Sequence, residues 1–277
     1  MGNVELHVAG RSAALSAAQV AAFEERGHVR LRGAFPREVA LQLQQRMWAE
    51  LQKDFGIDGD DRDTWYQPQR SLRGAKWDPL QRVIATDSLV GAIDALLGPG
   101  RWQVPTNWGV VLVTFPDRTR EWTLPTSGWH YDFDLGNNAI SPSGLLVFTF
   151  FSTVGSRGGG TLIVEGSHRL LRLFSESLSP DERRSDHHAM RRRFLRHDPW
   201  LRALAGASSA PKDRIGYFMR ETQEVRGVPV RVAELTGEPG DAILCHPLML
   251  HVSAPNRSET PRFMRSQRIC CDTGVHG

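Results

Sequence analysis

The sequence predicts a mainly β protein, a sandwich or barrel of short strands with helices packed on its outside. Two observations predict this class. Helical patterns with start and stop signals dominate the region from residue 15 to about residue 100. From residue 102 on, short runs rich in β-branched and aromatic residues alternate with turn residues. A helical front followed by many short strands is typical of layered β folds with external helices.

The N-terminal region, about residues 15–100, is expected to form helices joined by one strand. Ser16 can cap the first helix and Gly27 can end it, while Pro36 can begin the second helix. The segment before the third helix is polar and interrupted by Gly and Pro, so we expect a loop there. The predicted elements are a helix at 15–26, a strand at 28–32, a helix at 36–53, a loop at 54–81 and a helix at 87–97.

The remainder of the chain, about residues 102–272, is expected to form the β core. Its apolar runs are rich in β-branched and aromatic side chains, which favour strands over helices. A charged helical stretch at 170–205 lies between two groups of strands. We interpret it as an insertion, and the chain (1–277) as a single domain. The predicted strands are 102–115, 145–154, 161–164, 228–235, 241–245, 248–253 and 262–270.

The composition is typical of a soluble globular protein, with 40% hydrophobic and 23% charged residues among 277. No apolar run reaches the roughly 18 residues of a membrane span, so we expect no membrane association. The N-terminus lacks the pattern of a secretory signal. The odd number of cysteines, three, indicates a reducing cytoplasm rather than a disulfide framework. Nothing in the sequence predicts the oligomeric state.

The net charge of +3 is partly local, because four arginines cluster within the 170–205 stretch. We interpret this cluster as a solvated helix face. An alternative is a patch for an anionic part of the substrate, such as a phosphate or coenzyme A. No nucleic-acid-binding motif accompanies the cluster, so we expect no nucleic-acid partner. The four residues are Arg191, Arg192, Arg193 and Arg196.

Candidate metal ligands are His130 and Asp132, which are separated by one residue. On a strand, residues two apart point to the same face, so both side chains can reach one metal ion. An imidazole and a carboxylate are two of the three ligands of the facial triad that suits iron(II). The third ligand must be a distant histidine, for which His246 and His251 are candidates. Asp134 is a second candidate carboxylate, since it lies on the same face of a regular strand.

Three further motifs follow in a set order. They are the segment GGGTLIVEGSHR at 158–169, the segment GDAILCHPLMLHVSAPN at 240–256, and Arg262. This arrangement resembles the phytanoyl-CoA dioxygenase-like family of iron(II)/2-oxoglutarate oxygenases. That family shows a His-x-Asp, a Gly-Ser-His turn, a Gly-Asp, a His-Pro, a His-x-Ser and an Arg. The resemblance runs from about residue 15 to residue 270, and it implies a double-stranded β-helix, the jelly-roll core of cupin-like proteins.

The resemblance implies the metal ligands and the type of reaction. His130, Asp132 and His251 match the family's metal ligands, in preference to Asp134 and His246. Related halogenating enzymes have a small residue at the position of Asp132, which leaves a place for chloride. The carboxylate present here therefore favours oxygen transfer over halogenation.

The resemblance also implies contacts with 2-oxoglutarate. Arg262 matches the arginine that pairs with the far carboxylate of the cosubstrate, in preference to Arg257. A guanidinium suits a carboxylate because it donates two parallel hydrogen bonds. Ser253 matches a hydroxyl that supports the same carboxylate, and Thr161 is expected to contact the cosubstrate. Asn107 is a further candidate, for contact with the cosubstrate or the substrate.

The expected activity is that of a 2-oxoglutarate-dependent iron(II) dioxygenase. It would hydroxylate or otherwise oxidise an unactivated C–H bond of a small molecule, in natural-product metabolism, using O2 and releasing succinate and CO2. Two alternatives are a non-catalytic jelly-roll protein that binds a small molecule, and a zinc-dependent cupin-like isomerase or hydrolase. The substrate itself is not predicted by any of the motifs.

Overall fold

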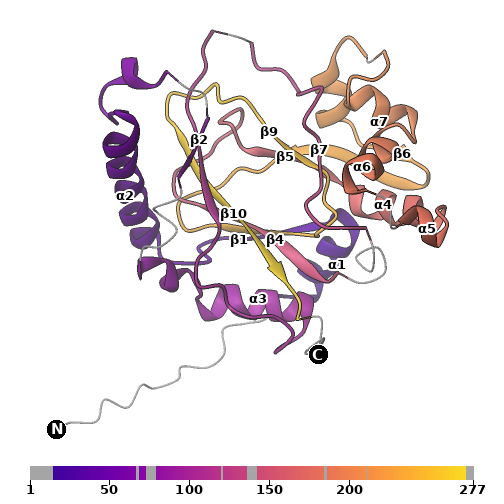
Figure 1. Ribbon diagram of the computed structural model, residues 1–277, viewed down its shortest axis with the longest axis horizontal. Coiled ribbons are helices and arrows are strands. Elements are labelled where there is room, and N and C mark those ends of the chain that lie inside the picture. Colours follow the sequence, from indigo (N-terminus) through magenta and orange to yellow (C-terminus); the bar gives the residue numbers. More distant parts are fainter. Residues whose placement is uncertain are drawn as a thin grey trace.

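The computed structural model describes residues 15–66, 69–72, 79–119, 121–135, 142–183, 186–209 and 211–272. Two antiparallel sheets face each other, and a group of helices packs on the outside of each (Figure 1). None of the helices in these ranges combines the length and apolar character that a membrane span needs.

The N-terminal helices begin and end at or within two residues of their predicted bounds. The elements are α1 (Ala17–Arg26), β1 (His28–Leu31), α2 (Arg37–Phe55) and α3 (Asp87–Leu97), with 3₁₀ turns at Arg62–Thr64 and Pro79–Ile84. Ser16 caps α1 in a capping box with Gln19, and Gly27 ends the helix in the left-handed conformation. Pro36 precedes α2, whose C-cap is Gly56, also left-handed.

The described strands form two sheets, one of six strands in the order β1-β8-β4-β10-β3-β2 and one of four in the order β6-β7-β5-β9. Most neighbouring strands are distant in sequence, as in a jelly-roll, and only the β2–β3 and β6–β7 pairs among the described strands are consecutive. The mainly β fold with flanking helices is therefore confirmed. The remaining strands are β2 (Gln69–Leu72), β3 (Val110–Thr114), β4 (Gly144–Phe150), β5 (Thr161–Glu165), β6 (Gln223–Val225), β7 (Val228–Glu234), β8 (Ala242–Cys245), β9 (His251–Ser253) and β10 (Arg262–Cys270).

Side chains alternate between the barrel interior and the outside along each strand. On β10, Met264 packs in the cluster between the sheets, with Phe148 of β4 and Ile163 of β5. Its neighbour Phe263 points the other way, into the cluster beneath the N-terminal helices. Arg262, Met264, Ser266 and Arg268 therefore share the inner face of β10.

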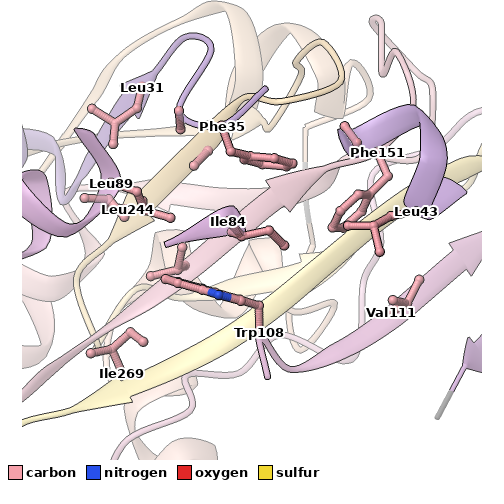
Figure 2. Close-up of a cluster of buried hydrophobic side chains, with 14 of the residues drawn as sticks. Leu31, Phe35, Leu43, Ile84, Leu89, Trp108, Val111, Phe151, Leu244 and Ile269 are labelled. Atoms are coloured by element: carbon pink, nitrogen blue, oxygen red, sulfur yellow. The ribbon is translucent and has the colours of Figure 1, made fainter. Parts of the chain in front are cut away.

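The outer face of the six-stranded sheet packs against α1, α2 and α3. In Figure 2, Leu43 from α2 and Leu89 from α3 belong to one cluster with Val111, Leu244 and Ile269 from the sheet. All five side chains are at most 2% exposed. Removing this apolar area from water is the main stabilising contribution of the layer.

The outer face of the four-stranded sheet is covered by the helices of the predicted insertion. These helices lie on the side of the molecule away from α2 (Figure 1). Phe174 and Trp200 from them pack in one cluster with Leu162 and Val230 from the sheet. The elements are α4 (Ser167–Glu176), α5 (Pro180–Arg183), α6 (His187–Leu195) and α7 (Pro199–Leu204), followed by a π-helical turn at Gly216–Arg220.

Three predicted elements differ from the structure. The strand expected at 102–115 is limited to β3, because the turn before it places Gly109 in the left-handed conformation against the backbone of Ser266. The strand expected at 248–253 is limited to β9, because the Met249 N–H donates to the carbonyl oxygen of His246 in a turn. The predicted loop at 54–81, part of which lies outside the described residues, contains the edge strand β2, which pairs with β3.

Candidate metal centre

The backbone holds His130 and His251 beside each other. The N–H of each residue donates to the carbonyl oxygen of the other, over 3.0 and 2.8 Å. His251 is the first residue of β9 and pairs with Ile163 of β5, whose side chain lies between the sheets. Cross-strand partners point to the same face, so the His251 imidazole also faces the barrel interior. The centroids of the two imidazole rings are 4.1 Å apart.

Hydrogen bonds to backbone carbonyls fix which nitrogen of each imidazole is free. The Nδ1 atom of His130 lies 2.7 Å from the carbonyl oxygen of Gly128. The Nδ1 atom of His251 lies 2.9 Å from the carbonyl oxygen of Met249. Because a carbonyl oxygen only accepts, Nδ1 carries the hydrogen in both residues, and Nε2 keeps its lone pair. This is the usual arrangement around a histidine that ligates a metal.

Asp132 places a carboxylate between the two imidazoles. Its oxygens lie 3.7 Å from the His130 Nε2 atom and 3.9 Å from the His251 Nε2 atom. These distances exceed those of hydrogen bonds. The three potential ligand atoms all lie within 4.8 Å of one another. The group can therefore converge on one ion through two nitrogens and an oxygen, the donor set of the iron(II) facial triad.

Asp132 does not lie on a strand, contrary to the sequence prediction. Only His130 pairs with β9, and the chain bends at Asp132. The antiparallel register would place Met249 opposite Asp132, but Met249 lies in the turn before β9 and offers no extended partner. The bend, rather than strand alternation, brings the carboxylate to the imidazoles.

His251 is electrically neutral in the folded protein at neutral pH. Burial, and then the proximity of His130, lowers its pKa to about 4, although the Asp132 carboxylate acts in the opposite direction. A neutral imidazole can donate its Nε2 lone pair to a metal without first losing a proton.

Arg262 provides a buried cation on the interior face of β10. It is 1% exposed, yet its Nε and Nη2 atoms have no hydrogen-bond partner among the described residues. The Oγ1 atom of Thr114, its cross-strand partner on β3, is likewise buried without a partner in that part of the chain. Buried polar groups are nearly always paired, so this pair indicates a place for an external acceptor.

The charge of Arg262 fits an anionic acceptor. Burial lowers the pKa of its guanidinium to about 10, and the Glu234 carboxylate partly opposes this effect. The side chain therefore remains cationic at neutral pH. A carboxylate that accepts from Nε and Nη2 would complete two parallel charge-assisted hydrogen bonds.

The other expected cosubstrate contacts lie in different places. Thr161 and Ser253 are cross-strand partners on β5 and β9, one step along the sheet from the Ile163–His251 pair. They face the interior, on the side of the barrel where Gly159 approaches Thr114. Asn107 lies beyond the opposite end of β3, and its side-chain oxygen accepts from the Gly109 N–H over 3.2 Å. Thr161 and Ser253 therefore lie toward Arg262, and Asn107 does not.

The rival candidates are occupied elsewhere. The Nδ1 atom of His246 accepts from the Leu248 N–H, and its ring packs 4.8 Å from that of His168. Neither His246 nor Asp134 belongs to the convergent group among the described residues. The Nη1 atom of Arg257 donates to the carbonyl oxygen of Asp117 over 2.9 Å.

Three residues around this centre were not singled out from the sequence. Phe148 packs edge-on to the His251 ring, with centroids 6.1 Å apart. Thr114 lies opposite Arg262, and Arg268 lies at the far end of the same inner face of β10. Residues two apart on a strand share a face, so counting in steps of two from Arg262 along the predicted strand would have placed Arg268 on the same face.

Comparison with known proteins gives structural neighbours but no sequence family. No protein-family model matches the chain, and no curated protein matches it. One similar structure is the non-heme alpha ketoglutarate dependent carbocyclase SnoK from nogalamycin biosynthesis, with 16% identity and a TM-score of 0.53 over 93% of this chain and 84% of that one.

Two other similar structures contain a metal. EctD from S. alaskensis with bound Fe has 18% identity and a TM-score of 0.52, over 95% of this chain and 80% of that one. HygX from Streptomyces hygroscopicus with nickel and 2-oxoglutarate bound has 14% identity and a TM-score of 0.53, over 93% of this chain and 88% of that one. At such identities the likeness shows a shared fold only.

Proposed function

We propose that this chain is an iron(II)/2-oxoglutarate-dependent dioxygenase that hydroxylates, or otherwise oxidises, a C–H bond of a small molecule. The observation that carries the proposal is the buried guanidinium of Arg262, whose unpaired N–H groups face the same barrel as the convergent group of His130, Asp132 and His251. A metal site alone would suit a zinc isomerase or hydrolase as well, but buried guanidinium N–H groups without a hydrogen-bond partner need an acceptor, and a carboxylate supplies one for each.

Each residue has a defined task in this proposal. The Nε2 atoms of His130 and His251 and the Asp132 carboxylate hold the metal, and Arg262 binds the far carboxylate of 2-oxoglutarate. Thr161 and Ser253 support that carboxylate. When bound, iron(II) and 2-oxoglutarate supply the oxidation, in which one atom of O2 enters the substrate and the other converts 2-oxoglutarate to succinate with loss of CO2.

The sequence motifs and the structural neighbours support a finer assignment. The order of motifs is that of the phytanoyl-CoA dioxygenase-like family, and we infer that the chain is a member of it. One of the similar structures is an enzyme of nogalamycin biosynthesis. We accordingly place the substrate among the small molecules of natural-product metabolism.

Anaerobic spectroscopy tests the metal and cosubstrate assignment. Iron(II) and 2-oxoglutarate together should produce a weak visible absorption band that neither produces alone. Asp132→Ala removes the only carboxylate of the convergent group, so the band should disappear or shrink strongly. Asp134→Ala removes the neighbouring carboxylate and should leave the band intact.

Two results would contradict the proposal. An unchanged band in Asp132→Ala would show that this carboxylate holds no metal. Zinc retained after native purification, with no succinate formed from 2-oxoglutarate in the presence of iron(II) and O2, would favour the zinc isomerase or hydrolase instead.

A further inference from the structure

Two arginines occupy the inner face of β10, one on each side of the metal centre. Phe148 contacts the His251 ring, and its cross-strand partner on β10 is Ser266. The metal centre is therefore level with Ser266. Arg268 is two residues further along and Arg262 four residues back, which correspond to roughly 7 and 13 Å of strand.

The two arginines differ sharply in their surroundings. Arg262 is enclosed, whereas Arg268 is exposed at the end of the strand. The Nη1 atom of Arg268 lies 3.4 Å from the carbonyl oxygen of Asp132, a long and weak hydrogen bond. No carboxylate pairs with it among the described residues, so its charge is uncompensated beside a metal ligand.

The inner face next to Arg268 carries apolar side chains, of which one is exposed. Its cross-strand partner on β4 is Leu146, a member of the cluster between the sheets. Val110, opposite Ser266 on β3, is 38% exposed although it belongs to the inner face. A ligand that lies here would meet the exposed Val110 side chain and the Arg268 guanidinium, next to the Asp132 main chain.

We propose that Arg268 binds an anionic group of the substrate, a carboxylate or a phosphate, and so positions the oxidised carbon over the metal. The inference rests on the proposed function, since it names the class of substrate that the same centre accepts. Arg262 then serves the cosubstrate anion inside the barrel, and Arg268 serves the substrate anion at its mouth. A charge-assisted hydrogen bond suits both groups.

Ligand-observed NMR tests this role with defined probes. Saturation-transfer measurements with acetate and with methylphosphonate, which share a methyl reporter, compare the carboxylate with the phosphate-like group, and acetamide serves as the neutral control. Both anions or one of them should bind, and acetamide should not. Arg268→Gln should weaken anion binding about tenfold, as expected for loss of one charge-assisted hydrogen bond, while Arg268→Lys should retain part of it.

A matched variant controls for the change in net charge. Arg172→Gln removes a guanidinium that is exposed on α4 and paired with Glu176. This variant should bind the probes as the wild type does. With Mn(II) and saturating 2-oxoglutarate, the methyl signal of a bound probe should also broaden, because the probe lies close to the paramagnetic ion, and Arg268→Gln should abolish the broadening.

The outcomes separate this inference from the proposed function. Saturation transfer requires no metal, so a protein that takes up no Mn(II) or 2-oxoglutarate refutes the function while the comparison with Arg268→Gln still decides the anion site. Equal probe binding in wild type and Arg268→Gln overturns the role of Arg268. A loss of Mn(II) affinity in Arg268→Gln as large as the loss of probe binding also overturns it, because the side chain would then only position Asp132.

Discussion

At the scale of single residues, the two histidines of the candidate metal centre are oriented by the main chain. The carbonyl oxygens of Gly128 and Met249 each accept from an imidazole Nδ1. In many metal sites a carboxylate accepts this hydrogen bond from the histidine ring. A backbone acceptor cannot be removed by a side-chain substitution, so the tautomers of His130 and His251 depend on the local chain path and not on a neighbouring residue.

Arg262→Leu should raise the apparent Kd for 2-oxoglutarate by more than about a hundredfold, since breaking a buried charge pair costs about 3–5 kcal/mol. Titration of the visible band with 2-oxoglutarate measures this Kd. Arg262→Lys keeps the charge but not the two parallel N–H groups. Its Kd for 2-oxoglutarate should lie between those of the wild type and Arg262→Leu.

Arg257→Leu is the matched control, because Arg257 is the other arginine that the sequence offers for this role. Its guanidinium already donates to the backbone carbonyl of Asp117, so its loss should leave the Kd nearly unchanged. Equal effects of Arg257→Leu and Arg262→Leu would contradict the assignment.

Residue types and spacing predicted part of the group of side chains that the structure brings together. The spacing of His130 and Asp132 indicated a metal pair, but two histidines remained as the third ligand until the resemblance favoured His251. The structure brings His251, and not His246, to the pair because Pro247 and the following turn separate the end of β8 from β9. Such a separation depends on tertiary structure and has no signature in the spacing.

At the scale of elements, helix ends could be predicted more accurately than strand ends. A cap is a local interaction, and Ser16 and Gly27 bound α1 as expected. A strand ends where its partner ends. The chain leaves the sheet after His130 because the partner strand begins at His251, and four polar-rich residues form β2 because β3 offers a free edge. Both facts depend on distant residues.

Gly27 joins α1 to β1, and Gly27→Ala should destabilise the protein more than an ordinary helix-end substitution. A left-handed conformation costs a non-glycine residue about 1–2 kcal/mol. The added Cβ would in addition meet the His168 ring and the end of the Met249 side chain. Urea denaturation of the variant should show that its free energy of unfolding falls by clearly more than this conformational cost.

Gly56→Ala separates the two contributions. Gly56 ends α2 in the same left-handed conformation, with nothing within 4 Å of the position of an added Cβ. The free energy of unfolding of this variant should fall only by the cost of the left-handed conformation, about 1–2 kcal/mol. A Gly27→Ala variant no less stable than Gly56→Ala would show that the neighbours of Gly27 adjust at no cost.

At the scale of the whole molecule, the helix-then-strand order of the sequence predicted the fold class correctly. It predicted neither which sheet each helix group covers nor the jelly-roll itself, which came from the family resemblance. The described chain consists of layers: N-terminal helices, the six-stranded sheet, the four-stranded sheet and the insertion helices. Strand pairing across long sequence separations creates these layers, and periodicity within a strand carries no information on its partner.

Two histidines at the junction of α1, α4 and β8, the buried His168 and the half-buried His246, should make the fold sensitive to acid. Burial lowers the pKa of His168 to about 4 and that of His246 to about 3. The unfolded chain takes up protons near pH 6.5, before the folded protein does, so stability falls as pH decreases below 6.5. The loss should reach about 3 kcal/mol per histidine by pH 4.

Urea denaturation between pH 7 and pH 5, with a chelator to exclude metal release, measures this dependence. His246→Gln removes one of the titrating groups and should flatten the decline relative to the wild type. A decline of the same steepness in both proteins would show that His246 does not contribute.

The backbone bridge between His130 and His251 also has a consequence for how this chain can change in length. The two proposed ligands are the ends of one long chain segment, closed by the two hydrogen bonds of an isolated antiparallel bridge. The entropy of closing a flexible loop grows only with the logarithm of its length, about 0.6 kcal/mol for each doubling. Segments can therefore be added to or removed from the outer helices between the two histidines at little thermodynamic cost, while the positions of the ligand atoms stay the same.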